Sequence, residues 1–326
     1  MSVAEVYGER LLALVERGKD WLATASGEFS DFTFARDQGI QDAELRDEVL
    51  ANLRELGLIE PSGRKRGCYC TVADNCPRID WQTATDDWFP LWLPLGIGEL
   101  AGTRKKNIIV IAGETNAGKT AFVLNMAYKN LSKNHGKHRQ VWYFNSEMGG
   151  DELRGRLLNI DRDVDHWDGF EPFERVRDFH QVIRPEGLNI IDYMEITQDF
   201  SLVADWITKI HSRLTTGVAV VCLQKKKTED TGRGGEFTLE KCRLGLALSY
   251  NHGVNACKIV KCKNPVGVTN PQGQERDFEI VRGADISPVS EWRWMTAAER
   301  KAKWKSYETR QSLRSAMSRA GMDDDD

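Results

Sequence analysis

A short glycine-containing stretch in the first half of the chain combines residue types that bind phosphate. Its two glycines, followed by a lysine and a threonine, have the G-x-x-x-x-G-K-[ST] spacing of a phosphate-binding loop. Glycine lets the backbone turn tightly enough to aim several N–H groups at one anion, and the following helix adds its positive N-terminal dipole. We expect the lysine to neutralise the β and γ phosphates of a nucleotide and the threonine to offer its hydroxyl to Mg²⁺. The loop residues are Gly113, Glu114, Thr115, Asn116, Ala117, Gly118, Lys119 and Thr120.

The segments on either side of this loop have the order that phosphate binding requires. Residues 107–112 form a short apolar, β-branched run of the kind that a buried parallel strand shows. Residues 121–127 continue as a predicted helix. The alternative is a Gly-rich turn with an exposed lysine, and the strand, loop and helix order favours the phosphate site over it.

Two further apolar runs contain carboxylates near their ends. Residues 141–148 include Glu147, and residues 188–193 include Asp192. Proteins with parallel sheets place their chemistry at the carboxyl ends of the strands, so both carboxylates are candidate site residues. In a P-loop enzyme, the strand that carries the magnesium-ordering aspartate should end at that aspartate, as the run 188–193 does at Asp192. We therefore expect Asp192 to contact the nucleotide and to share Mg²⁺ with Thr120.

The remaining apolar pattern predicts an α/β fold. Residues 200–214 have helical spacing, and residues 217–224 form a fourth apolar strand. Further strands are expected at 256–262 and 276–282. Because strands and helices alternate with short loops, we predict a mostly parallel sheet with helices on both faces.

The position of the candidate catalytic glutamate separates classes of P-loop protein. In AAA+ machines a glutamate directly follows the magnesium-site aspartate, whereas Tyr193 follows Asp192 here. The sequence Phe-Asn-Ser-Glu-Met at 144–148 resembles the Phe-Ser-Leu-Glu-Met of DnaB-type replicative helicases. Residues 191–193 also resemble the Walker B end of those proteins. Over about residues 96–285 the chain therefore resembles the RecA and DnaB superfamily, which implies a RecA-like fold.

The resemblance also implies roles for individual side chains. Glu147 would be the catalytic base, and Gln224 would be the sensor that links the γ-phosphate to a DNA-binding loop. Lys261 and Lys263 would act from a neighbouring subunit. RecA carries Lys-x-Lys at that place and DnaB carries Lys-x-Arg, so a lysine would replace the arginine finger. The segment 232–241 is closest to that of phage and mobile-element ATPases.

The same resemblance implies cofactors and partners. ATP and Mg²⁺ are the expected cofactors, and DNA, in single-stranded form, is the expected partner. The expected assembly is a homo-oligomeric ring or filament. Magnesium-dependent ATP hydrolysis coupled to DNA binding or translocation, in replication or recombination, is the function implied first. The alternatives are an ATP-switched loader or regulator without strand separation, and a small-molecule kinase, which would need an acceptor pocket in place of the polar loop after Gln224.

A second, smaller module precedes the predicted ATPase domain. A helix over 42–56 is followed by a strand, a basic turn and another strand, an order that resembles a winged helix. The turn carries Arg64, Lys65 and Arg66. Residues 1–75 hold nine basic against fourteen acidic residues, and DNA phosphates would repel so acidic a module. DNA reading, contact through the wing alone and binding to another protein all stay open.

Two polar segments are candidate DNA contacts. Residues 225–241 hold five basic and four acidic residues and are predicted to be a flexible loop facing a central channel, with a solvated turn as the alternative. Thr296 and Glu299 form a capping-box signature, which predicts that a helix begins there. Residues 297–320 hold seven basic and two acidic residues, which suits phosphate contact or a solvated face. Interleaved tryptophans that could stack on bases are Trp292, Trp294 and Trp304.

Length, charge and cysteine content bound the remaining possibilities. A chain of 326 residues with 40% apolar content is long enough for one sizeable α/β core and a smaller module. The net charge of −4 excludes a surface coated in basic residues, so DNA contact must come from local patches. An odd count of seven cysteines favours reduced thiols, and the cluster Cys68, Cys70 and Cys76 lacks a fourth ligand for zinc.

The chain also lacks the signals of a membrane protein. No apolar run reaches the roughly 18 residues of a membrane span, and the N-terminus has no signal-peptide pattern, so we expect a cytoplasmic protein without membrane contact. The predicted domains are 1–75 (winged-helix-like), 76–100 (linker), 101–290 (RecA-like ATPase) and 291–326 (basic helical tail with an acidic end).

Overall fold

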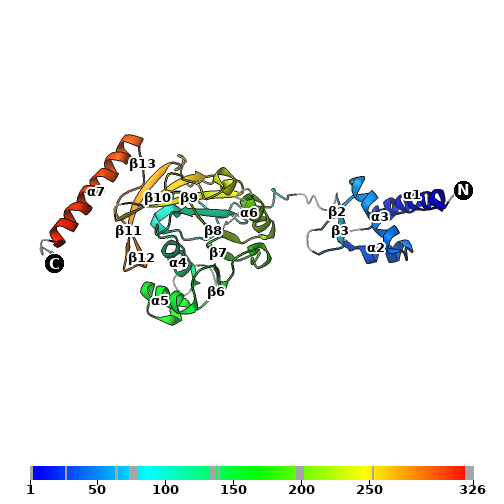
Figure 1. Ribbon diagram of the computed structural model, residues 1–326, viewed down its shortest axis with the longest axis horizontal. Helices are drawn as coiled ribbons and strands as arrows, with labels where there is room; N and C mark the ends of the chain where they lie inside the picture. The colour runs from blue at the N-terminus through cyan, green and yellow to red at the C-terminus, as the bar shows by residue number, and fades with distance from the viewer. Residues whose placement is uncertain are drawn as a thin grey trace. The chain divides into compact units, whose positions relative to one another are not determined.

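A computed structural model describes residues 3–25, 28–62, 65–72, 79–132, 137, 140–195, 202–251 and 253–319. The chain divides into two compact units, Met1–Thr85 and Asp86–Asp326 (Figure 1). Arg64, Cys76 and the terminal aspartates 323–326 lie outside the described residues. Among the described helices, none has the length and apolar content needed to cross a membrane.

The N-terminal unit packs three helices on a small antiparallel sheet. Its strands have the order β1-β3-β2. The third helix begins where the Asp42 carboxylate accepts hydrogen bonds from the backbone N–H groups of Glu44 and Leu45. The winged-helix assignment and its partner stay predictions. The elements are α1 (Val3–Leu22), β1 (Phe29–Ser30), α2 (Asp31–Gln38), α3 (Ala43–Glu55), β2 (Ile59–Pro61) and β3 (Cys68–Thr71).

The second unit is built on a sheet of ten described strands. The order is β12-β11-β10-β9-β4-β8-β7-β5-β6, and β13 pairs with β11. The six strands from β9 to β6 run parallel, while β10 to β13 are antiparallel additions at one side. The parallel part is β4 (Ile108–Gly113), β5 (Val141–Asn145), β6 (Phe170–Glu174), β7 (Leu188–Asp192), β8 (Val218–Gln224) and β9 (Cys242–Asn251). The antiparallel part is β10 (Val254–Cys262), β11 (Gln274–Val281), β12 (Asp285–Pro288) and β13 (Arg293–Trp294).

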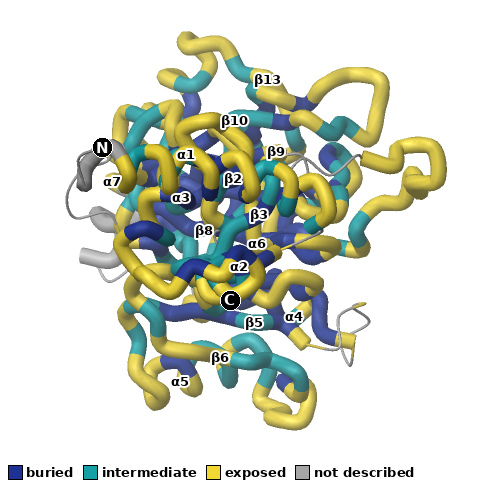
Figure 2. Tube along the Cα trace, turned by 90° about the vertical axis from the view of Figure 1, so that its right-hand side faces the viewer, coloured by how far each residue is buried: buried dark blue, intermediate teal, exposed yellow. Residues whose placement is uncertain are grey.

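Helices cover both faces of this sheet, which explains its continuous apolar strands. In β4, Ile109 and Ile111 face one core cluster, whereas Ile108 and Val110 face the other. A strand buried on both faces has no polar side to alternate with, so every residue of β4 is buried. In Figure 2 the strand β5 is mostly buried, whereas much of the helix α5 is exposed.

One face is covered by α4 and α5 and the other by α6. Short 3₁₀ turns fill the connections between these helices and the strands. The helices are α4 (Lys119–Asn130), α5 (Gly150–Ile160) and α6 (Leu202–Arg213), and the 3₁₀ turns are η1 (Pro94–Glu99), η3 (Val164–Trp167), η4 (Phe179–Gln181) and η5 (Gly235–Leu239).

Residues 86–100, predicted as part of the linker, pack on the second unit. The Arg104 guanidinium lies 3.8 Å from the ring centroid of Trp88, and that ring fills the space where Gly102 would carry a Cβ. The Asn130 side chain holds the backbone of Trp92 through two hydrogen bonds of 2.8 and 2.9 Å. The aromatic residues here act as packing groups, so the boundary between the two units falls after Thr85.

The last helix, α7 (Ala297–Arg319), is attached to the sheet by buried charges. Lys303 Nζ lies 2.8 Å from Asp277 and 3.7 Å from Glu275 of β11, and Arg300 lies 2.6 Å from Glu275. The predicted capping box is present, because Thr296 and Glu299 exchange hydrogen bonds at the helix start. Figure 1 shows α7 running on past β13. Two of its basic residues are therefore already neutralised by the sheet.

A close approach between two strand starts gives a stability prediction. The backbone of Gly187 passes so near Gly217 that a Cβ on Gly217 would lie 2.6 Å from the Gly187 nitrogen. Backbone atoms cannot yield as a flexible side chain can, so Gly217→Ala should lower the free energy of unfolding by about 3 kcal/mol. Chemical denaturation measures this change.

A matched glycine provides the control for that measurement. Gly155 lies inside α5 with open space around its missing Cβ. Since alanine is the better helix former, Gly155→Ala should leave stability unchanged or raise it by up to about 1 kcal/mol. Equal effects of the two substitutions would contradict the close-approach argument.

Candidate nucleotide-binding site

The predicted phosphate loop lies between the central strand β4 and the start of α4. Asn116 and Gly118 both have left-handed backbone conformations, with φ values of 62° and 82°. Asparagine and glycine tolerate this region best, which is how the loop turns back before the helix begins. A Cβ on Gly113 would lie 2.5 Å from Lys119 Cγ. The first glycine therefore leaves the space that the lysine side chain occupies.

Lys119 points back over the loop from the first turn of α4. Its Nζ donates to the carbonyl oxygens of Gly113 at 3.2 Å and Glu114 at 3.0 Å. Burial lowers the pKa of the Lys119 ammonium, while the carboxylates of Asp192 and Glu147 act in the opposite direction. A cation held beside carboxylates and backbone oxygens is suited to an anionic ligand.

Asp192 ends β7 and is buried at the base of the site. The Tyr143 hydroxyl donates to its Oδ2 at 2.7 Å, and the Thr120 hydroxyl also hydrogen-bonds to this carboxylate. Burial raises the pKa of Asp192, and both hydrogen bonds together with Lys119 oppose that rise. The structure thus brings Thr120 and Asp192 together as predicted for a shared metal ion.

This pair of oxygen donors fits Mg²⁺. Magnesium prefers hard oxygen ligands and is usually held by one or two protein groups together with substrate phosphates. Within the described ranges, no group of three or more His, Cys, Asp or Glu side chains could hold a metal ion. A hydroxyl and a carboxylate beside a phosphate loop therefore suit a metal that the nucleotide helps to bind.

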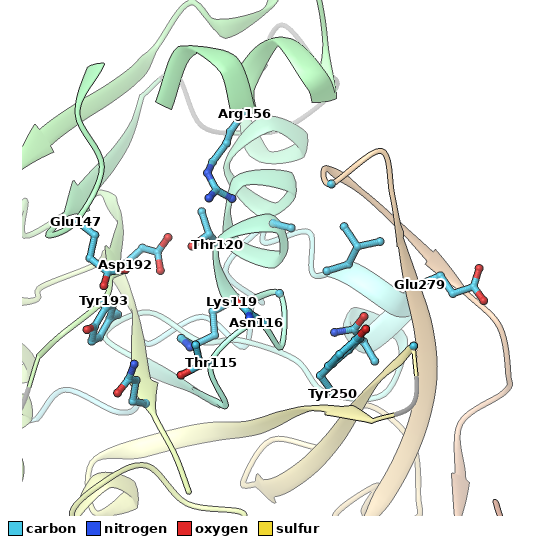
Figure 3. A pocket seen from close by; sticks show the side chains of 17 residues that line it. Thr115, Asn116, Lys119, Thr120, Glu147, Arg156, Asp192, Tyr193, Tyr250 and Glu279 are labelled. Atoms are coloured by element: carbon cyan, nitrogen blue, oxygen red, sulfur yellow. The ribbon is translucent and has the colours of Figure 1, made fainter. Parts of the chain in front are cut away.

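Glu147 lies just after β5 on the same side of the pocket as Asp192 and Tyr193 (Figure 3). Its position depends on Asn145, whose Oδ1 accepts hydrogen bonds from the backbone N–H groups of Glu147 at 3.2 Å and Met148 at 3.1 Å. Burial is the largest cause that raises the pKa of Tyr193, and the charge of Glu147 is the second largest. Sequence reasoning missed Asn145, because it reads as the last residue of an apolar strand.

Gln224 ends β8, and the sheet register places it opposite Gly113. The Gln224 carbonyl accepts a hydrogen bond from the backbone N–H of Arg233 at 2.7 Å, and the next residue, Lys225, donates its own N–H to Gly113 at 3.1 Å. Gln224 therefore lies between the phosphate loop and the segment that follows it, where the predicted sensor should be.

One pocket of about 780 Å³ is lined by Lys119, Thr120, Glu147, Asp192 and Gln224, together with residues that the sequence did not reveal. Arg156 reaches it from α5 and points toward Thr120 (Figure 3), and it also pairs with Glu152 at 2.8 Å. In the sequence this pair looks like an ordinary i, i+4 contact on a helix surface. Tyr250 and Glu279 lie across the phosphate loop from Glu147. The other unpredicted lining residues include Asn255 and Ile280.

Lys261 and Lys263 do not line this pocket in the described part of the chain. The Lys261 ammonium donates to the Leu239 carbonyl oxygen, and the strand register shifts between Ile259 and Lys261. Lys263 is exposed beyond the end of β10. Because of this shift, the side chains of Lys261 and Lys263 cannot be placed by assuming that alternate residues of a strand point to the same face. Their role at a neighbouring subunit stays a prediction.

The segment 225–241 is more ordered than its polar sequence suggested. Lys225, Thr238 and Leu239 are buried, and η5 packs against α6. The prediction of a flexible loop was wrong for these residues, because Leu239 joins the apolar cluster under α6. Exposed residues remain at 226–228, 230, 233, 236–237 and 240–241.

The chain is similar to DnaB-type proteins over the part that contains the phosphate loop. A family model described as the DnaB-like helicase C terminal domain matches residues 98–184. The replicative DNA helicase DnaB of Rickettsia prowazekii is 27% identical over 137 residues, and that of Rickettsia conorii is 26% identical. These matches cover 38% of this chain and only 27% of each relative. A KaiC-like protein from Pyrococcus horikoshii has a TM-score of 0.49 and 13% identity, covering 63% of this chain and 99% of that chain.

The matched region holds the phosphate loop, Glu147 and Arg156, and it ends before Asp192. The site residues beyond it rest on geometry: Asp192 and Gln224 end neighbouring parallel strands beside the loop. The phosphate loop, the order of the parallel strands and the matched family model together make the second unit similar to the RecA/DnaB superfamily of P-loop proteins.

Proposed function

We propose that the second unit binds ATP with Mg²⁺ and hydrolyses it. The observation that supports this most strongly is the convergence of Lys119, Thr120, Glu147, Asp192 and Gln224 on one pocket from four parallel strands and their loops. A Gly-rich turn with an exposed lysine would not need carboxylates and a glutamine from three other strands around it.

In this proposal each side chain acts on the triphosphate or on water. Glu147 orients or deprotonates the water that attacks the γ-phosphate, and Lys119 balances the charge that spreads over the phosphate oxygens. Thr120 and Asp192 would hold Mg²⁺, which when bound neutralises the phosphate charge. Arg156, which points toward Thr120, adds a second cation near the phosphates.

We propose DNA as the partner and a ring or filament of identical subunits as the working form. The relatives named above are replicative DNA helicases, and they support a role in replication or recombination. Gln224 would report the state of the γ-phosphate to residues 225–241, whose exposed lysines are the candidate DNA contacts. Translocation on single-stranded DNA is the output that this arrangement suits best.

Substitutions at the phosphate loop and at the base test the hydrolysis proposal. Lys119→Ala should abolish ATP turnover without unfolding the protein, because it removes the cation that the phosphates would contact. Glu147→Gln should still bind ATP but turn over at least about a hundredfold more slowly, the scale of losing a positioned base. Steady-state ATPase assays and nucleotide titrations measure both. Near-normal turnover by Glu147→Gln would show that another group activates the water.

The charge of the N-terminal unit predicts weak binding to duplex DNA. Five acidic residues lie within 42–55, whereas the basic turn offers only Arg64, Lys65 and Arg66. Residues 1–85 should bind a duplex through these three charges, and their joint replacement by alanine should reduce the slope of log K against log salt by about 3. Fluorescence anisotropy over a salt series measures the slope. Tight binding that survives the replacement would assign DNA contact to another surface.

The two lysines after β10 give a prediction about assembly. Lys263→Ala should keep ATP binding but lose DNA-stimulated turnover, because catalysis would then lack the cation from the neighbouring subunit. Mixing this variant with Lys119→Ala should restore part of the activity, since some interfaces would pair an intact phosphate loop with an intact Lys263. A mixture that stays inactive would refute the shared site.

A further inference from the structure

A buried ion pair joins the phosphate loop to the segment after the sensor glutamine. Glu114 is the first residue after β4, and Lys225 directly follows Gln224. Glu114 Oε1 lies 2.9 Å from Lys225 Nζ. The Lys225 side chain is only 1% exposed and that of Glu114 is 13% exposed. Neither the phosphate-loop pattern nor the hydrolysis mechanism above requires this pair.

Burial makes each charge dependent on the other. Removing one partner of a buried pair leaves an uncompensated charge, whereas the intact pair adds little net stability once its desolvation is counted. The only other acceptor found for Lys225 Nζ among the described residues is the Lys226 carbonyl oxygen, at 3.4 Å. The two charges are therefore held together, and the pair gives a fixed connection between the two segments.

Glu114 also contacts the cation that a phosphate would attract. The Glu114 carbonyl oxygen accepts a hydrogen bond from Lys119 Nζ at 3.0 Å, while its side chain holds Lys225. A bound phosphate competes with that carbonyl for the Lys119 ammonium, because charged acceptors make the stronger hydrogen bonds. Phosphate binding thus changes the contacts of the same residue that anchors the start of segment 225–241.

The surroundings of Lys225 leave room for this segment to shift. A pocket of about 260 Å³ adjoins the pair and is lined by Glu114, Lys225 and Lys227 together with Asp230 and Lys258. Asp230 pairs with Lys258 of β10 at 2.5 Å. Two pairs of opposite charge, Glu114–Lys225 and Asp230–Lys258, therefore border the same pocket. A shift of Lys225 would therefore change the electrostatic interactions of the charged residues around this pocket.

We propose that the Glu114–Lys225 pair is a positioning pair that transmits nucleotide binding to residues 225–241. The inference rests on the proposed ATP site, because it describes how occupancy of that site changes the segment. It assigns no catalytic step to either residue. A purely structural pair would stabilise the fold equally with and without nucleotide, which separates the two possibilities.

Hydrogen exchange of the full chain tests the proposal. The amide exchange of the peptide covering residues 226–241 is measured with and without Mg²⁺ and a non-hydrolysable ATP analogue, at saturation for each variant. In the wild type the analogue should change exchange in this peptide by about fivefold or more, the lower range of a typical coupling between sites. Lys225→Met and Glu114→Gln should both lose this response.

Three further variants control for damage to the fold. Lys225→Arg and the charge swap Glu114→Lys with Lys225→Glu should retain a response, since each keeps an ion pair at this place. Lys303→Met breaks another buried lysine–carboxylate pair in the same unit, with Asp277, and should keep the wild-type response. If Lys303→Met also loses it, general destabilisation explains the effect and the proposal is refuted.

The outcomes separate this inference from the proposed function. A wild type that does not bind the analogue overturns ATP binding and the inference with it. A wild type that binds and responds, together with single variants that respond equally, overturns only the inference. Loss of the response in both single variants with recovery in the swap supports it. If one single variant does not fold, the other single variant decides, and loss of the response in Lys225→Arg or in the swap, which both keep an ion pair, would contradict the proposal.

Discussion

The in-register ends of parallel strands are the constraint on which the site depends. The sheet pairs Gly113 of β4 with Gln224 of β8, and Asn145 of β5 with Asp192 of β7. Since parallel strands point the same way, these residues and the loops after them meet at one edge of the sheet. A slip of one residue would turn each strand-end side chain to the opposite face and into an apolar core. The two-sided apolar packing therefore fixes the chemistry as well as the fold.

Burial at that edge gives the charged groups their properties. Asp192 is inside the protein, and its carboxylate is held by the hydroxyls of Tyr143 and Thr120. Lys119 is desolvated in the same region, so each group depends on a partner of opposite charge or on a hydrogen-bond donor. A nucleotide with its metal ion would supply such partners. The same reasoning applies to Glu114 and Lys225, whose charges are satisfied within the chain.

The antiparallel strands extend this site, and α7 packs on them rather than forming a separate tail. The last residues of β9 and β11 bring Tyr250 and Glu279 to the pocket. The same β11 carries Asp277, which binds Lys303 of α7. Trp292, considered above for base stacking, donates its indole N–H to the Leu95 carbonyl oxygen and packs on the core. Charges and aromatic rings that looked available for nucleic acid are thus partly used to assemble the domain.

The sequence alone determined the features that depend on local order. A loop with two glycines, a lysine and a threonine between an apolar run and a helix favours the phosphate-loop turn that the structure shows. Thr296 with Glu299 fixes a helix start through short-range hydrogen bonds. Apolar runs also located β4, β5, β7 and β8, because burial on both faces leaves a continuous pattern. The strand β9 was missed, and so was β6, which alternates little and lies at the sheet edge.

Only the tertiary structure decided which distant residues share the site. Arg156, Asn145 and Tyr250 carry no local signal, because a charged pair on a helix surface, an asparagine at a strand end and a tyrosine in a strand look alike wherever they occur. The Glu114–Lys225 pair joins residues 111 positions apart, and nothing short-range in either segment requires it. The order of segment 225–241 likewise comes from Leu239 entering a core built by α6. Contacts across the sheet edge form only after the chain has folded, and the spacing of residues along the sequence does not encode them.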